Sequence, residues 1–275
     1  MKPTPAITRA FQGRNVILTG AASGIGRALA RLLSHCGATT YAIDMDADGL
    51  ASLAGECTGP GAVHPVQLDV RDRAAYAAVV SRIQSEAESI DYLFNNAGVT
   101  LLGEAQKLPF DRWKWLLDIN LMGVVNGVNA VYPIMIAQGS GHIINTASIA
   151  GATGYATAAA YTTSKAAILE FSRSLRAEAK AYGVKVYVAC PGYVDSGIFH
   201  QDRIVGADRE AMIRDLPVKM MTTDQAAFGF LSGVVNGKNT IIFPFSAKFL
   251  WYLSCWAPAM TGPFHKRFLR VFQKS

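Results

Sequence analysis

Tyr161 and Lys165 are the two residues whose types and spacing most directly indicate chemistry. They stand four positions apart in the helical pattern AYTTSKAAILEFSRSLRAEAKAYG, so a phenol and an ammonium share one helix face. A phenol with its ordinary pKa of about 10 exchanges protons poorly at neutral pH, and a neighbouring ammonium stabilises its ionised form. The pair therefore predicts acid–base chemistry on a substrate oxygen, although an accidental pair on a solvated helix has the same spacing.

Two further polar residues fall where they would be held in place by regular structure. Ser148 follows the apolar run HIINTA and would project from the carboxyl end of a strand, where its hydroxyl can polarise a substrate carbonyl. A simple turn serine has the same position. Asn120 is a polar residue within the helical segment DRWKWLLDINLMGVVNG, and a buried amide needs hydrogen-bond partners. Asn120 is therefore either a structural bridge or part of a water relay.

A glycine-rich loop lies between the apolar run NVIL and an amphipathic helical pattern. In TGAASGIG, Gly20 permits a tight turn, Gly24 lets backbone N–H groups approach an anion, and Gly26 lets the helix pack against the sheet. The helix N-terminus then faces the anion, with Ser23 and Ile25 beside it. The loop predicts a pyrophosphate cradle, and a plain strand-to-helix turn is the alternative.

Asp44 bears on the choice of dinucleotide, because it lies 18 residues past Gly26 and ends the strand-like run TTYAID. A carboxylate there accepts hydrogen bonds from the ribose hydroxyls and repels a 2′-phosphate, which favours NAD over NADP. An unrelated strand-end Asp is the alternative interpretation, and Arg27 is the nearest base for a phosphate. Asp69 and Val70 end a third apolar run, where the adenine ring would lie.

The elements that position these residues alternate along the chain, because short apolar runs follow longer helical patterns in the order β-α-β-α-β. Further apolar runs at residues 92–95, 142–146 and 185–189 are typical of strands buried on both faces of a parallel sheet. We predict a single α/β domain, a Rossmann-type doubly wound parallel sheet with helices on both faces, over residues 1–240. A hydrophobic and basic C-terminal extension follows over residues 241–275.

The composition is that of a folded chain with a large core. Of 275 residues, 51% are hydrophobic and 17% are charged, which excludes disorder, collagen and a disulfide miniprotein. The net charge of +6 comes from residues 225–275, which hold six bases and no acid. A nucleic-acid-binding protein spreads bases over a folded face, so we expect no nucleic-acid partner. Four cysteines and five histidines without ligand spacing predict no metal and a reducing, cytoplasmic compartment.

Taken together, these residues resemble the classical short-chain dehydrogenase/reductases from residue 15 to about residue 197, in an unbroken order of motifs. The motifs are TGAASGIG at 19–26, Asp69, NNAG at 95–98, Asn120, Ser148, YTTSK at 161–165 and Pro191-Gly192. The resemblance implies a catalytic tetrad of Asn120, Ser148, Tyr161 and Lys165. In that tetrad Tyr161 exchanges the proton, Lys165 binds the nicotinamide ribose and lowers the pKa of Tyr161, and Asn120 helps hold a relay water.

The resemblance also implies which residues bind the cofactor. Where the family usually has a threonine after Pro-Gly, this chain has Ser196, which keeps a hydroxyl for the nicotinamide amide. A homodimer or homotetramer is expected. The expected cofactor-binding residues are Gly20, Ser23, Gly24, Ile25, Gly26, Asp44, Asp69, Val70, Asn96, Ala97, Gly98, Tyr161, Lys165, Pro191, Gly192, Val194 and Ser196.

In this family the stretch after Pro-Gly forms a mobile lid over the substrate, here about residues 196–221. Its apolar side chains stand among charged ones, a mixture that suits closure over an apolar substrate and equally suits a plain surface helix. A lipophilic alcohol or ketone, steroid-like or long-chain, therefore fits better than a phosphorylated sugar.

The C-terminal extension has no charge from residue 249 to residue 264, which is shorter than the ~20 residues that span a bilayer. Pro258 and Pro263 interrupt it, so a spanning helix is not expected. Interleaved aromatic and basic residues suit either an interfacial membrane anchor or a cover over a subunit interface or the substrate pocket. These residues are Trp251, Tyr252, Trp256, Phe264, Phe268 and Phe272, with Lys266, Arg267, Arg270 and Lys274.

The sequence as a whole predicts an NAD-dependent oxidoreductase that interconverts a secondary alcohol and a ketone on a lipophilic substrate. One alternative is an NADP-linked reductase of long-chain keto-lipids, in which Arg27 meets the phosphate. The other is a nucleotide-sensing or membrane-scaffold protein that binds NAD without turnover. The expected location is cytoplasmic, with peripheral membrane contact through the extension.

Overall fold

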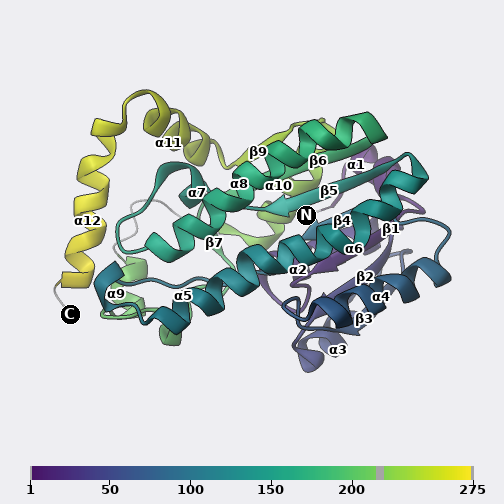
Figure 1. Ribbon diagram of the computed structural model, residues 1–275, viewed down its shortest axis with the longest axis horizontal. Helices are drawn as coiled ribbons and strands as arrows, with labels where there is room; N and C mark the ends of the chain where they lie inside the picture. The colour runs from purple at the N-terminus through teal and green to yellow at the C-terminus, as the bar shows by residue number, and fades with distance from the viewer. Residues whose placement is uncertain (1, 215–219, 274–275) are drawn as a thin grey trace.

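A seven-stranded parallel sheet lies between two layers of helices in the computed structural model, which describes residues 2–214 and 220–273 (Figure 1). The strand order is β3-β2-β1-β4-β5-β6-β9, so the predicted doubly wound α/β fold is confirmed. The strands predicted at residues 92–95, 142–146 and 185–189 are β4, β5 and β6. The strands are β1 (Asn15–Thr19), β2 (Thr39–Asp44), β3 (Val63–Gln67), β4 (Tyr92–Asn95), β5 (Gly141–Thr146), β6 (Val184–Pro191) and β9 (Thr240–Phe243).

Helices cover both faces of the sheet, which is why the central strands read as uninterrupted apolar runs. In β1 the side chains of Val16, Ile17 and Leu18 are completely buried. Phe11 and Phe230 belong to the core on one face, under α1 (Pro5–Phe11), α2 (Gly24–His35) and α10 (Thr223–Val235). The core on the other face lies under α4 (Arg73–Glu86), α6 (Gly123–Gln138) and α8 (Ala159–Ala179). The remaining helical segments before the lid are α3 (Ala47–Glu56), η1 (Ala105–Lys107), α5 (Phe110–Leu117), η2 (Asp118–Met122), α7 (Ile149–Thr153) and η3 (Lys180–Tyr182).

The winding direction of the sheet reverses between β1 and β4, which lie side by side. In open α/β sheets the ligand crevice lies at such a reversal, outside the carboxyl ends of the strands. The glycine loop follows β1, Asp44 ends β2, and Ser148 follows β5. The topology therefore brings residues that are distant in sequence to one edge of the sheet.

One continuous helix, Phe110–Gln138, has the length and apolarity of a membrane span within the described part of the chain. Its residues Val124, Val128, Val131 and Met135 are buried in the core beneath the sheet. The core helix of a soluble protein passes the same length and apolarity test, so core packing accounts for the apolar character of this segment.

The segment that the sequence predicts to be a lid follows β6, and the chain beyond β9 forms two α-helices at one end of the molecule (Figure 1). α11 lies beside α7, and α12 lies beside α9. β9 begins at residue 240 and is a strand of the main sheet. The division of the chain into a catalytic domain and an extension at this residue stays a prediction. Lid residues 215–219 and Lys274 of the extension lie outside the described residues. These elements are β7 (Val194–Asp195), η4 (Gln201–Arg203), α9 (Arg209–Arg214), β8 (Met221–Thr222), α11 (Phe245–Trp256), η5 (Pro258–Thr261) and α12 (Gly262–Gln273).

Candidate active site

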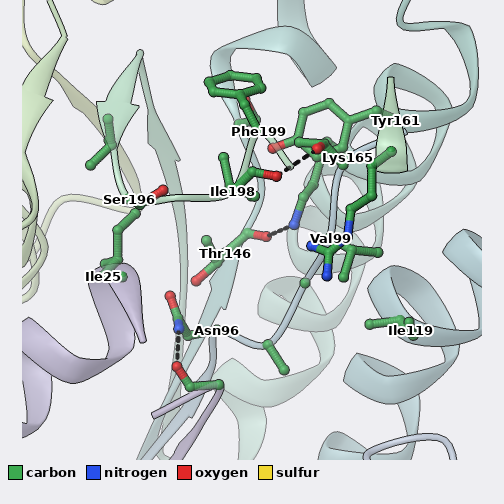
Figure 2. Close-up of a pocket in the computed structure, with 18 of the residues that line it drawn as sticks. Ile25, Asn96, Val99, Ile119, Thr146, Tyr161, Lys165, Ser196, Ile198 and Phe199 are labelled. Carbon is green, nitrogen blue, oxygen red and sulfur yellow. Dashed lines mark hydrogen bonds between the residues drawn. The ribbon is translucent and has the colours of Figure 1, made fainter. Parts of the chain in front are cut away.

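A cavity of about 740 Å³ runs along the carboxyl edge of the sheet. The glycine loop and Asp44 line it, and so do Ser148 and Tyr161. Ile25 of the glycine loop and Tyr161 lie on opposite sides of the cavity (Figure 2). Among the predicted site residues, Gly26 and Asn120 do not line this cavity. Those that do are Gly20, Ser23, Gly24, Ile25, Asp44, Asp69, Val70, Asn96, Ala97, Gly98, Ser148, Tyr161, Lys165, Pro191, Gly192, Val194 and Ser196.

The glycine loop has the geometry of an anion cradle. Gly20 and Gly24 have φ angles of +68° and +55°, which favour glycine. A Cβ on Gly26 would lie 1.8 Å from the carbonyl oxygen of Gly20, so Gly26 lets the first turn of α2 pack against its own loop. The sequence predicted instead that Gly26 lets the helix pack against the sheet. Ser23 precedes α2 without a side-chain capping bond, which leaves the first N–H groups of the helix for an anion.

The Asp44 carboxylate is held at the cavity wall by two backbone donors. The N–H of Ala22 donates to one carboxylate oxygen at 3.0 Å, and the N–H of Asp46 donates to the other at 3.1 Å. Each oxygen keeps further acceptor capacity, because a carboxylate oxygen accepts about two hydrogen bonds. Asp44 can therefore accept the two hydroxyls of a ribose.

Arg27 lies outside the cavity lining, and its guanidinium is occupied by the domain itself. Its Nε and Nη2 donate to the two carboxylate oxygens of Glu56 at 3.1 and 2.8 Å, and Nη2 also donates to Ser52 at 2.7 Å. Its Nη1 donates to the carbonyl oxygens of Ala22 and Gly49 at 2.8 and 3.0 Å. These five bonds use all five N–H donors of an arginine side chain.

Asp69 and Asn96 line the cavity, and their side chains make hydrogen bonds within the protein. Arg71 Nε donates to both oxygens of Asp69, at 3.0 and 2.9 Å, and this bond lowers the pKa of Asp69. The amide of Asn96 donates to the carbonyl oxygens of Thr19 and Gly20 at 3.1 and 3.3 Å (Figure 2). Asn96 therefore braces the glycine loop, which a sequence motif alone does not reveal.

Lys165 and Tyr161 lie together at the other end, on the first turns of α8. Lys165 is 3% exposed, and its Nζ donates to the carbonyl oxygen of Thr146 at 2.9 Å (Figure 2). The Nζ lies 5.8 Å from the centre of the Tyr161 ring. The Oγ of Ser148 accepts the N–H of Ala150 at 3.1 Å, and Ser148 lies close enough to Tyr161 to lower its pKa.

Burial dominates the proton affinities of this pair. It lowers the pKa of Lys165 to about 8, and it raises the pKa of Tyr161 to about 12 despite the lowering effect of Ser148. The sequence predicted the opposite direction for Tyr161, on the strength of the neighbouring ammonium. In the protein alone the Lys165 ammonium is directed at Thr146, so desolvation of the phenol outweighs it.

Asn120 lies behind the cavity wall in the π-helical turn between α5 and α6, completely buried. Its Nδ2 donates to the Val99 carbonyl oxygen at 2.9 Å and to Ser164 at 3.0 Å, while its Oδ1 accepts the Val99 N–H at 2.8 Å. A Cβ added at Gly98 would lie 3.2 Å from both Asn120 Oδ1 and Lys165 Nζ. Asn120 therefore acts at least as a structural bridge, next to the lysine.

Residues of the chain after β6 also line the cavity. Ser196 lies against the glycine loop, since a Cβ on Gly24 would sit 3.1 Å from its carbonyl oxygen. The Thr100 hydroxyl donates to the carbonyl oxygen of Ile198 at 2.9 Å (Figure 2). Trp115 and Arg203 also line the cavity, and sequence reasoning missed both because their contact depends on how the lid folds.

A parallel sheet with a glycine cradle at its winding reversal, and a tyrosine and lysine in the same cavity, define the class of NAD(P)-binding oxidoreductases with a Rossmann-like fold. Residues 14–204 match the family described as short chain dehydrogenase. The chain therefore belongs to the short-chain dehydrogenase/reductase family, as the motifs predicted.

Individual relatives agree with this assignment. SadH of Mycobacterium tuberculosis, which is named as an oxidoreductase, is 32% identical over 244 residues, covering 86% of this chain and 88% of SadH. A short chain dehydrogenase/reductase of Burkholderia phymatum in complex with NAD has a TM-score of 0.81 and 26% identity, over 91% of this chain and 96% of that one. A short-chain dehydrogenase of Sphingobium yanoikuyae in complex with NADPH has a TM-score of 0.77 and 26% identity, over 90% and 95%.

Proposed function

We propose that this chain is an NAD-dependent oxidoreductase that interconverts a secondary alcohol and a ketone on a lipophilic substrate. The observation that carries the proposal is one cavity lined by the glycine loop and Asp44 at one end and by Ser148, Tyr161 and Lys165 at the other. A cavity of about 740 Å³ also lies within the usual size range of small-molecule and cofactor sites, about 300–1,000 Å³.

Asp44 and Arg27 support NAD as the cofactor rather than NADP. Asp44 offers acceptors to ribose hydroxyls, and its charge opposes a 2′-phosphate. All five donors of Arg27 are used within the domain, so recruiting Arg27 for a phosphate would break its pair with Glu56. Of the two related structures, one is a complex with NAD and the other with NADPH, so the proposed preference for NAD rests on these two side chains.

We assign the chemistry to the side chains at the Tyr161 end. NAD, when bound, supplies a hydride acceptor at its nicotinamide ring. In the oxidative direction Tyr161 takes the proton of the alcohol hydroxyl, and the Ser148 hydroxyl orients the same oxygen. A positive charge from Lys165 favours the ionised phenol, and this requires Lys165 to exchange its bond to Thr146 for contacts at the bound ribose.

The proton that Tyr161 accepts must then leave the buried site. Gly98 brings Lys165 Nζ and Asn120 Oδ1 to a shared place, because a side chain at Gly98 would contact both. A water beside Gly98, hydrogen-bonded to both of these atoms, would accept a proton from Lys165 and donate to Asn120 Oδ1. This gives Asn120 its predicted relay role in addition to its bridge to Val99.

The lining of the Tyr161 end supports a lipophilic substrate. Several apolar and aromatic side chains line it, and they come from the loop after β4, α5, η2, α7 and the chain after β6. Side chains of this kind gain free energy by covering the apolar surface of a substrate. The residues are Val99, Leu102, Trp115, Ile119, Ile149, Phe199 and Met212.

The two helices of the extension support two separate roles. Phe272 of α12 is 2% exposed in a cluster with Leu102, Ile204 and Met212, so α12 covers the lid from outside.

On α11 the aromatic residues at 245, 249, 252 and 256 are 55–86% exposed along one face. No acid occurs after residue 224, which favours contact between α11 and an anionic membrane surface. We also propose a homo-oligomer, and cross-linking with and without anionic vesicles would separate the two uses of α11.

The test of the proposed function is turnover on a panel of alcohols from short chains to steroids and long-chain hydroxy-lipids, with NAD and NADP compared at equal concentration. NAD-linked oxidation of the lipophilic members supports the proposal. Turnover with NADP alone would favour the keto-lipid reductase. NAD binding without turnover on any member, and no change after Tyr161→Phe, would favour the sensor or scaffold.

A further inference from the structure

Arg203 is a charged residue in an otherwise apolar part of the cavity. It lies on η4 of the lid and lines the cavity together with Trp115 and Leu102. Its backbone carbonyl accepts the N–H of Leu102 at 2.9 Å, so the position of the residue is fixed against the cavity wall. Its guanidinium stacks over the Trp115 ring, 5.8 Å from the ring centre. The charged group is therefore held beside the substrate end, with the Arg203 side chain 24% exposed.

One nitrogen of the Arg203 guanidinium, Nε, is buried and lacks a hydrogen-bond acceptor among the described residues. The nearest carboxylate is that of Asp202, whose oxygen is 4.0 Å from this Nε and whose side chain is 69% exposed. A separation of 4.0 Å is too long for a hydrogen bond, and a buried N–H without a partner is costly. Arg27, whose five donors are all used, shows the contrast within the same chain.

The acidic residues that line the cavity all belong to one end, where the base Arg71 pairs with Asp69. These acidic residues, Asp44, Asp46 and Asp69, belong to the end with the glycine loop, since they end or follow β2 and β3. The lid contributes Arg203 and His200, and no Asp or Glu of the described lid residues lines the cavity. The substrate end therefore combines apolar side chains with a guanidinium whose Nε has no hydrogen-bond acceptor among the described residues.

We propose that Arg203 binds an acidic group, a carboxylate, on the part of the substrate away from the reacting carbon. The inference rests on the proposed function and deepens it: the substrates are lipophilic alcohols or ketones that carry a carboxylate. Arginine suits this role because its planar fork matches a carboxylate in two parallel hydrogen bonds. The Trp115 ring restricts the guanidinium beforehand, so less side-chain entropy is lost on binding.

The test compares two ligands of equal chain length, decanoate and decanol, by calorimetry on the NAD-loaded protein at pH 7.5. The measurement needs no turnover. The variants are Arg203→Gln, which removes the charge, and Arg203→Lys, which keeps it without the fork. Arg214→Gln is the matched control, because Arg214 is exposed on α9 of the same lid and does not line the cavity.

The proposal predicts that the wild-type protein and Arg214→Gln bind decanoate about ten-fold more tightly than decanol, and that Arg203→Gln abolishes this preference. Arg203→Lys should retain part of it. The proposal is overturned if the wild-type protein binds no decanoate or binds decanoate and decanol equally. It is also overturned if the preference survives Arg203→Gln or disappears in Arg214→Gln. Failure of the proposed function would appear separately, as absent oxidation of both hydroxy-acids and their methyl esters while the decanoate preference persists.

Discussion

The guanidinium of Arg27 and the carboxylate of Glu56 form a bidentate pair, with Nε donating to Oε2 at 3.1 Å and Nη2 donating to Oε1 at 2.8 Å. The pair raises the pKa of Arg27 and lowers that of Glu56. Because its donors are used in this pair, Arg27 is not free to bind the 2′-phosphate of NADP, as an NADP preference would require. The proposed preference for NAD therefore depends on a contact between α2 and α3 as well as on Asp44.

Asp44→Ser combined with Glu56→Gln should shift the preference toward NADP. The first change removes the charge that opposes a 2′-phosphate, and the second frees the Arg27 guanidinium to meet it. We expect kcat/KM with NADP, relative to NAD, to rise by about ten-fold or more, which corresponds to about one charge-assisted hydrogen bond. Glu56→Gln alone is the control and should leave NAD preferred, because Asp44 remains. An unchanged ratio in the double variant would contradict the assigned roles.

Gly26→Ala should abolish cofactor binding and destabilise the fold. Its Cβ would lie 1.8 Å from the Gly20 carbonyl oxygen, so the loop or the first turn of α2 must shift. Overpacking of this kind costs about 1–3 kcal/mol of the free energy of unfolding. Gly55→Ala is the control, because a Cβ there has no atom within 4 Å and lies in helix α3. Urea unfolding with NAD titration measures both effects, and a Gly26→Ala protein that binds NAD normally would contradict the cradle.

The buried ammonium of Lys165 should make stability depend on pH. Its pKa is lowered from 10.5 to about 8, so between these values the unfolded chain holds a proton that the folded protein has released. The free energy of unfolding of the wild-type protein, relative to Lys165→Met, should therefore rise from pH 8 to pH 10, by up to about 1.4 kcal/mol per pH unit. Denaturant unfolding at several pH values measures it. A difference that stays flat or falls would show that Lys165 is solvated.

Phe272→Ala should loosen the cover over the lid. Phe272 is 2% exposed and packs with Leu102, Ile204 and Met212. Leu102 and Met212 also line the cavity. We expect a raised KM for lipophilic substrates with little change in kcat, and faster amide hydrogen exchange in α9. Phe249→Ala is the control, since Phe249 of α11 is 62% exposed and should leave both unchanged. Equal effects of the two substitutions would contradict a specific role of α12.

The sequence was sufficient to predict the sheet and much of the cavity lining, because buried parallel strands have uninterrupted apolar runs and the motif residues directly follow them. It could not predict the raised pKa of Tyr161, since spacing to Lys165 does not report desolvation or the bond from Lys165 to Thr146. The Arg27 pair with Glu56 joins residues 29 positions apart on separate helices, which no local pattern indicates. Likewise, Arg203 meets Trp115 only through the fold of the lid.

The proton-transfer role of Tyr161 is the central claim, and hydride transfer from a secondary alcohol deuterated at its carbinol carbon tests it most directly. The wild-type protein should produce deuterated NADH, and Tyr161→Phe should lower the rate about 10²–10⁴-fold while the Kd for NAD changes little. Tyr182→Phe is the control, because Tyr182 is an exposed tyrosine on η3. A Tyr161→Phe protein that transfers deuterium at the wild-type rate, or a wild-type protein that binds NAD and transfers none, would contradict the account.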